Sequence, residues 1–239
     1  MRTRVVFLFL GLAIFRGLFF RPSTFDEPLQ VKQVSEAEDR LTCLYFPEFM
    51  VKQVETSDKG AEQISIVPVA THVPECRRAN VPTEIVISPD VWTGYVKGVR
   101  SPYLFLSGED GAGLLYAFAV FDVRTGQKLF EDATHVDKGF HSIEVAGPVL
   151  TMEYSRAIQL DCSLFRDPTR SGGRACWEKA QRELHLQLPM PDCSRSYLRD
   201  APDLPEDPSD IAFDVKGVWD GHQFSVTPVG DSALCAARP

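Results

Sequence analysis

Six cysteines constrain the fold of this chain more than any other feature of its sequence. Their number is even, and no two of them are spaced as C-x-x-C, so they indicate neither a zinc knuckle nor a thioredoxin-type redox pair. We therefore predict structural disulfides, which are typical of proteins that fold in an oxidising compartment. The cysteines are Cys43, Cys76, Cys162, Cys176, Cys193 and Cys235.

The first 21 residues have the pattern of an export signal. Arg2 and Arg4 precede an apolar run from Val5 to Phe15, which fits the hydrophobic region of a signal peptide and is too short for an ordinary membrane span. No small-x-small cleavage triplet follows, so a cleaved signal peptide and an uncleaved N-terminal anchor both stay open. We expect a periplasmic or secreted protein, or one anchored in the inner membrane and facing the periplasm.

Acidic residues dominate the rest of the chain. The chain has 25 basic and 33 acidic residues, and residues 1–21 contain four arginines and no acid, which leaves 21 basic residues and a net charge of −12 beyond them. Nucleic acids and anionic membrane surfaces bind clustered positive charge, so we expect neither as a partner. A membrane contact is expected only if residues 1–21 remain uncleaved. The negative charge also keeps an exported protein soluble.

Short strands separated by turn residues are predicted from residue 41 onward, after an extended lead-in over 22–40. Residues 114–123 are apolar on both alternating faces, which predicts a strand buried on both sides. A turn at 124–127 then predicts a hairpin with 128–131. Further strands are predicted at 41–50 with a break at Pro47, at 64–69, at 83–88 and at 103–106.

Two periodic segments place two of the cysteines on buried faces. Apolar and polar residues alternate from 150 to 164, which predicts a half-buried strand with Cys162 on its buried face. Residues 174–186 lack proline and glycine and repeat apolar residues every four positions, which predicts a helix with Cys176 facing the core. We therefore favour a Cys162–Cys176 disulfide, worth about 3 kcal/mol in the chain-entropy model. Cys43–Cys76 and Cys193–Cys235 are then the simplest other pairs, and a Cys176–Cys193 bridge is the alternative.

The C-terminal part reads as a strap followed by a hairpin. Proline and aspartate are frequent over 189–210, and strands at 212–219 and 223–229 flank a turn at Asp220-Gly221. Short strands, turns and one helix together predict a mainly β or α+β fold, an antiparallel β-sandwich or open barrel stabilised by disulfides. We expect a β-rich core domain over 41–188, with the strap and terminal hairpin over 189–239.

No catalytic or cofactor-binding motif is recognisable, and no cofactor is expected. The glycine-rich segment 108–113 precedes a strand rather than a helix, so we predict a turn and not a phosphate site. The densest set of potential metal ligands crosses a predicted turn at Lys138-Gly139, which favours a solvated loop over a metal site. These residues are Asp132, His135, Asp137 and His141.

Two further patterns favour structural roles. A catalytic thiolate paired with His72, His185 or His222 would leave an odd thiol in an oxidising space, so a nucleophilic cysteine is not expected. Acidic residues of the strap offer oxygen ligands for calcium, but they lack the D-x-D-x-D-G spacing, so a solvated linker is favoured. They are Asp200, Asp203, Glu206, Asp207 and Asp210.

Four aromatic residues form the candidate ligand surface, namely Trp92, Tyr95, Tyr103 and Trp219. Aromatic residues in strands are more often part of the core, and that alternative stays open. We favour a non-enzymatic module that binds a protein, peptide or glycan. An exported hydrolase stays open, because scattered carboxylates leave no local signature. A small periplasmic enzyme inhibitor, presenting the disulfide-braced loop 163–175, also stays open.

Overall fold

The computed structural model describes residues 24–36, 39–58, 60–70, 72–109, 113–165, 172–203 and 205–238. The expected signal segment 1–21 lies outside the described residues, as do positions 110–112 of the glycine-rich segment and 166–171 of the predicted inhibitor loop. Within the described part of the chain, neither helix is long and apolar enough to cross a membrane.

The first sheet is an antiparallel meander in which each strand pairs with the next along the chain. The segment expected to be a lead-in belongs to this sheet, because residues 30–36 pair with the following strand over seven positions. Its polar sequence is that of a solvent-facing edge strand, in which Val34 packs against a cluster of buried residues. The strands are β1 (Gln30–Glu36), β2 (Asp39–Tyr45), β3 (Phe49–Glu55), β4 (Ala61–Pro68) and β5 (Ile85–Ile87).

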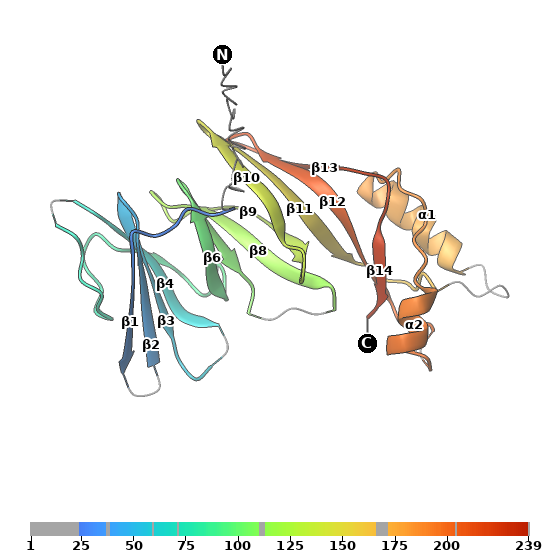
Figure 1. Ribbon diagram of the computed structural model, residues 1–239, viewed down its shortest axis with the longest axis horizontal. Coiled ribbons are helices and arrows are strands. Elements are labelled where there is room, and N and C mark those ends of the chain that lie inside the picture. Colours follow the sequence, from blue (N-terminus) through green and yellow to red (C-terminus); the bar gives the residue numbers. More distant parts are fainter. Residues whose placement is uncertain are drawn as a thin grey trace, which may run out of the picture.

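The second sheet has nine strands in the described residues, with the order β13-β12-β11-β9-β8-β7-β6, while β10 pairs with β11 and β14 with β12. Figure 1 shows this sheet running from the first sheet towards the two helices. The strands are β6 (Tyr95–Arg100), β7 (Tyr103–Ser107), β8 (Leu115–Asp122), β9 (Lys128–His135), β10 (Phe140–Ala146), β11 (Val149–Gln159), β12 (Ser209–Trp219), β13 (Phe224–Pro228) and β14 (Leu234–Ala237).

The two sheets pack face to face, which makes this half of the molecule a β-sandwich. The mainly antiparallel β fold with three disulfides confirms the predicted fold class. Apolar residues of β3 and β4 meet apolar residues of β6, β7 and β8 in one buried cluster. Its fully or almost fully buried members include Val51, Ile64, Ile66, Val99, Leu104, Leu106, Ala119 and Phe121.

Helices α1 (Gly172–Leu184) and α2 (Ser194–Asp200) lie at one end of the second sheet, beside β14 (Figure 1). The helix predicted at 174–186 begins and ends two residues earlier, at Gly172 and Leu184. It ends at Leu184 because the next residue, His185, adopts a left-handed backbone with φ of 54°. Trp177 of α1 and Tyr197 of α2 pack in one buried cluster with Leu150 and Met152 of β11. The alternation predicted over 150–164 is correct for β11, although the strand stops at Gln159.

The C-terminal segment 189–239, predicted as a strap and a terminal hairpin, contributes β12 to the second sheet. Strand β12 pairs with β11 over ten consecutive positions, from Leu150 with Trp219 to Gln159 with Asp210. It therefore lies inside the second sheet, and the strap before it contains helix α2. The terminal hairpin of β12 and β13 forms as predicted. Long-range pairing of this kind depends on the whole sheet, so local turn residues did not indicate it.

A buried ion pair fixes the chain just before β5. The Nζ atom of Lys52 lies 2.5 Å from Oε1 of Glu84, and both side chains are 1% exposed. Burial alone raises the pKa of the Glu84 carboxyl, but hydrogen bonds from Lys52, Ser65 and the Val81 N–H outweigh it and hold that pKa below its ordinary value. Since β5 leads directly into the turn at 88–94, this pair helps to position that turn.

Candidate functional site

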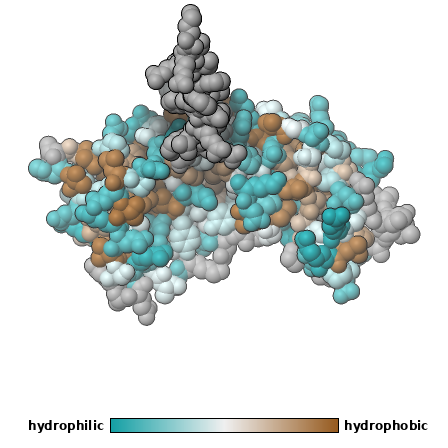
Figure 2. Space-filling model, viewed as in Figure 1, coloured by the Kyte–Doolittle hydropathy of each residue, from teal (hydrophilic) through white to brown (hydrophobic). Residues whose placement is uncertain are grey.

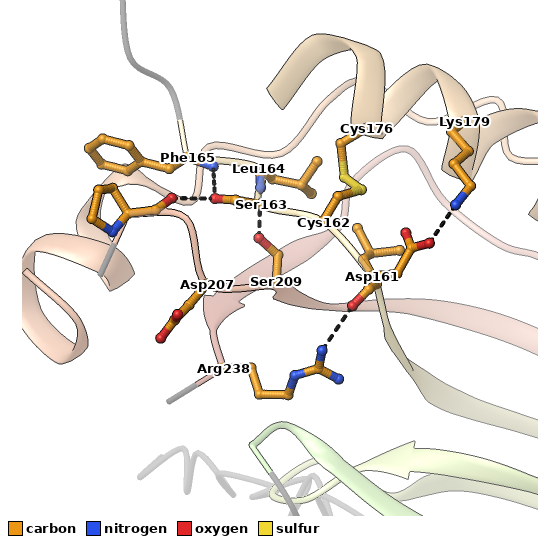
Figure 3. Close-up of a disulfide and its surroundings, with 12 residues drawn as sticks. Asp161, Cys162, Ser163, Leu164, Phe165, Cys176, Lys179, Asp207, Ser209 and Arg238 are labelled. Carbon is orange, nitrogen blue, oxygen red and sulfur yellow. Dashed lines mark hydrogen bonds and ion pairs between the residues drawn. A yellow bond between two sulfur atoms is a disulfide. The ribbon is translucent and has the colours of Figure 1, made fainter. Parts of the chain in front are cut away.

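All six cysteines form disulfides, so no thiol is available as a nucleophile. The pairs are Cys43–Cys76, Cys162–Cys176 and Cys193–Cys235, as favoured from the sequence, and not the alternative Cys176–Cys193. Figure 3 shows the bridge between Cys162, just after β11, and Cys176 on α1, with the ion pair of Lys179 and Asp161 beside it. Three disulfides without a free cysteine are typical of an oxidising, extracellular type of compartment.

The potential metal ligands of β9 and the following turn have separate partners. Asp132 accepts hydrogen bonds from the Tyr154 hydroxyl at 2.5 Å and from Nε of Arg156 at 3.0 Å. Burial lowers the pKa of His135, and its Nδ1 accepts the N–H of Asp137 at 3.1 Å. No group of three or more His, Cys, Asp or Glu side chains in the described residues is placed to hold a metal ion.

His141 belongs to a cluster with Ser155 and Asp214 that the sequence analysis missed. The three residues come from β10, β11 and β12, and two of them are 73 positions apart. Nε2 of His141 lies 3.2 Å from Oγ of Ser155 and 3.3 Å from Oδ1 of Asp214, while the Ser155 hydroxyl donates to Asp214. In a catalytic triad the histidine separates serine from the acid and accepts the serine proton. Here Nε2 of His141 faces both groups, and the Ser155 hydroxyl donates its hydrogen bond to Asp214 instead of to the histidine. Ser155 is therefore not activated as a nucleophile.

The acidic residues of the strap do not converge. Asp200 pairs with Arg199 at 2.6 Å at the end of α2. Asp210 is fully buried and accepts the N–H of Leu114 at 3.1 Å through Oδ2. Burial raises the pKa of the Asp210 carboxyl. Asp203 is exposed, and the described strap has no arrangement suited to calcium.

The four candidate aromatic residues lie in different places. Tyr95 accepts the Gly60 N–H at 2.9 Å through its hydroxyl, which is a structural contact. Tyr103 is buried and donates its hydroxyl proton to the carbonyl oxygen of Pro148 at 2.7 Å. Trp92 and Trp219 are half-buried, and each lines a cavity. The predicted ligand surface therefore separates into two sites.

Trp92 is held by the turn that connects β5 to β6. The N–H groups of Val91 and Trp92 donate to the carbonyl oxygen of Ser88, and the indole Nε1 donates to the carbonyl oxygen of Ser107 at 3.2 Å. Gly94 permits this close approach, because a Cβ atom at that position would lie 1.8 Å from the same Ser107 oxygen. With φ of 143°, the position also favours glycine.

Trp92 lies where two adjoining cavities meet. The turn cavity, of about 430 Å³, is lined by residues 89–93, Gly108, Glu109 and Ala117. The strand cavity, of about 410 Å³, is lined by Trp92, Leu115, Ala117, residues 131–133, residues 156–159 and Leu184. Because the two cavities share Trp92 and Ala117, we treat them as one groove, the Trp92 groove.

The strand cavity lies where the ladder between β9 and β11 stops. These strands share one registered pair, Arg156 with Thr134. Continued antiparallel pairing would join residues 157–159 to residues 131–133, and both of these segments line the cavity instead. On their other sides, residues 157–159 pair with β12 and residues 131–133 pair with β8. The cavity is therefore bordered by two strand edges without a strand partner.

The two cavities differ in how their charges are balanced. In the strand cavity, Glu131 pairs with Lys128 at 2.7 Å, and Asp132 pairs with Arg156 at 2.9 Å. In the turn cavity, no basic side chain among the described residues pairs with Asp90 or Glu109. Ser88 holds Asp90, since its Oγ accepts the Asp90 N–H at 3.2 Å, and Glu109 packs against the buried Gly60.

The second aromatic site, the Trp219 pocket, has a volume of about 360 Å³ and is lined by Tyr103, Arg124, Leu129, Pro148 and Trp219 among others. The Trp219 ring packs 5.8 Å from the Phe130 ring. Arg124 is paired with Asp122 at 2.6 Å, so the charges of this pocket are balanced within the protein.

The large exposed apolar residues of the described chain are scattered. On the face shown in Figure 2, hydrophobic residues in brown are interspersed with hydrophilic residues in teal. The large exposed apolar residues come from separate segments, for example Leu29, Val73 and Leu198. Single exposed apolar residues are normal for a protein surface. The hollowed sites are therefore the stronger candidates for binding.

Most of the groove was not predictable from motifs, because its lining includes small residues such as Ala117, Ala133 and Ala157. Small residues at matching positions of neighbouring strands were the signal that could have indicated it. Of the groove residues, Trp92 was singled out for ligand binding, whereas Asp90 and Glu109 were not. No protein-family model, curated protein or solved structure matches this chain, so its assignment rests on the site geometry.

Proposed function

We propose that the protein is an exported, non-enzymatic binding module, periplasmic or secreted, that holds an extended ligand in the Trp92 groove. The observation that carries the proposal is the meeting of two cavities of about 430 and 410 Å³ at one tryptophan. Each cavity is in the size range of ligand sites, and an aromatic ring at their junction offers a large contact area at low entropic cost.

The three disulfides and the apolar segment Val5–Phe15 are typical of an exported protein, and they support the proposed compartment. The strand cavity supports a binding role rather than catalysis, because its carboxylates are engaged. Asp132 accepts the Tyr154 hydroxyl and pairs with Arg156, and Glu131 pairs with Lys128. A hydrolase using two carboxyl groups needs one of them shielded from water so that it stays protonated, and Asp90 of the turn cavity is exposed.

A ligand screen with two matched variants tests the proposal. The oxidised, exported protein is offered a glycan array and a random dodecapeptide phage library, in parallel with Trp92→Ala and Trp219→Ala. We expect ligands that bind the wild type and Trp219→Ala and lose about tenfold or more in affinity for Trp92→Ala. Melting temperatures show that each variant is folded.

The opposite outcomes contradict the proposal. If the selected ligands depend on Trp219 rather than Trp92, or if neither probe set yields a Trp92-dependent ligand, the groove is not the binding site. If mass spectrometry finds that a bound glycan or peptide is cleaved in a Trp92-dependent way, the protein is a hydrolase and the non-enzymatic assignment is wrong.

A further inference from the structure

We infer that the ligand is a peptide segment whose lysine or arginine side chain enters the turn cavity while its main chain lies along the strand cavity. This inference rests on the proposed function and deepens it by naming the ligand class. It depends on three observations, which are the charge of the turn cavity, the aromatic ring beside it and the open strand edges.

The turn cavity is lined by two carboxylates. Asp90 and Glu109 both line it, and within the described ranges neither has a basic partner. Both positions are structurally defined, since Ser88 accepts the Asp90 N–H and a Cβ atom at Gly60 would lie 2.7 Å from Oε1 of Glu109. A basic side chain that enters this cavity would therefore meet two carboxylates of complementary charge.

The Trp92 ring adds a second reason for a cation. Nζ of Lys128 lies 5.9 Å from the ring centroid, within the range of a cation–π contact, so one side of this ring already holds a cation and shows that a basic side chain can pack there. Lys128 does not line the turn cavity, and it is bound to Glu131 at 2.7 Å and to the Val91 carbonyl oxygen at 3.4 Å. Aromatic rings combined with carboxylates are a usual recognition site for cationic side chains.

The strand cavity favours a peptide over a glycan or a small amine. Residues 131–133 of β9 and 157–159 of β11 present edges towards the cavity that lack a strand partner. An extended peptide main chain has the alternating N–H and C=O groups that such edges bind by strand addition. Ile158 and Leu184 line the same cavity and provide apolar contact for a neighbouring side chain. The net charge of −12 beyond residue 21 also attracts a basic peptide over long range.

The dodecapeptide library tests the inference directly. We expect the peptides enriched on the oxidised full-length protein to contain lysine or arginine at a shared position. Replacing that residue with methionine in a synthetic copy of an enriched peptide lowers its affinity about tenfold, and so does the double variant Asp90→Asn/Glu109→Gln. The affinity also falls with increasing salt concentration.

A matched control removes the same number of charges elsewhere. Glu144→Gln/Glu153→Gln alters two exposed carboxylates of β10 and β11 that line neither cavity, and it leaves the peptide affinity unchanged. If the control lowers affinity as much as Asp90→Asn/Glu109→Gln, the attraction is general and the turn cavity is not the cation site.

The result separates this inference from the proposed function. If Trp92-dependent ligands are found but they are neutral peptides, acidic peptides or glycans, the groove is a binding site and the basic-peptide inference is wrong. If neither probe set yields a Trp92-dependent ligand, both are wrong. If the enriched ligand is a segment of this chain itself, the occupant is a second copy, and the separate-partner assignment is replaced.

Discussion

The Trp92 groove and the Trp219 pocket each contain a half-buried tryptophan, but they differ in the balance of their polar groups. In the Trp219 pocket, Arg124 is paired with Asp122 and the Tyr103 hydroxyl donates to Pro148. In the groove, the described surroundings leave Asp90 and Glu109 without basic partners. Two strand edges also border the groove without a strand between them.

This difference shows why an aromatic residue at a cavity is a weak indicator of binding. Polar groups that satisfy one another inside the protein have little to gain from a ligand. The two carboxylates and the open strand edges of the groove, in contrast, lack such partners among the described residues and can gain them from a ligand. We therefore interpret the pocket as structural and the groove as functional, and the following variants test this assignment.

The largest expected effect comes from removing the disulfide that supports one wall of the groove. Cys162–Cys176 ties the end of β11 to α1, which carries Leu184 of the strand cavity. Cys162→Ser/Cys176→Ser lowers the free energy of unfolding by about 3 kcal/mol, measured by chemical denaturation. It also weakens peptide binding to the groove in a direct titration.

The Cys43–Cys76 disulfide provides the control for that variant. It joins β2 to the segment that covers the outer face of the first sheet, away from both cavities. Cys43→Ser/Cys76→Ser lowers stability by a similar amount and leaves peptide affinity unchanged at temperatures where it is folded. Equal loss of affinity in both double variants would show that the wall formed by α1 has no specific role.

A smaller effect is expected for Trp219→Ala. The indole packs against Phe130 and is half-buried, so its removal lowers the free energy of unfolding by about 2 kcal/mol, less than for a fully buried tryptophan. Peptide affinity stays as in the wild type. A variant of normal stability with reduced affinity would reverse the roles assigned to the two sites.

The smallest effect is expected for the ion pair of the Trp219 pocket. A hydrogen bond from Arg124 is the main cause that holds the pKa of Asp122 below its ordinary value. The pair therefore stabilises the fold above a pH of about 4 and loses this effect as the pH falls through the lowered pKa. Since Arg124 is largely exposed, Asp122→Asn costs about 0.5 kcal/mol at neutral pH. Denaturation at several pH values checks this, and a difference that does not shrink as the pH falls below about 4 contradicts it.

Much of the local structure was predictable because it depends on neighbouring residues. The alternation around Tyr154 and the four-residue repeat around Cys176 identified β11, α1 and their disulfide. The turn at 124–127 identified the hairpin of β8 and β9. These features are determined by backbone period and turn chemistry, which a short stretch of sequence contains.

The groove was less predictable because it depends on where a ladder ends. No residue near Thr134 or Arg156 indicates that β9 and β11 pair at one position and then separate. The cluster of His141, Ser155 and Asp214 likewise requires the register of three strands. Trp92 and Trp219, which the predicted ligand surface groups together, line different cavities, and a sequence pattern does not show which strands adjoin.

Hydrogen–deuterium exchange of the full-length oxidised protein, with and without an enriched basic peptide, shows where the peptide binds. We predict that amides within residues 131–133 of β9 and 157–159 of β11 become protected when the peptide binds, because its main chain occupies the gap between these edges. Amides around the Trp219 pocket stay unchanged. Unchanged exchange in both β9 and β11, or new protection confined to the Trp219 pocket, would show that the groove does not bind the peptide main chain.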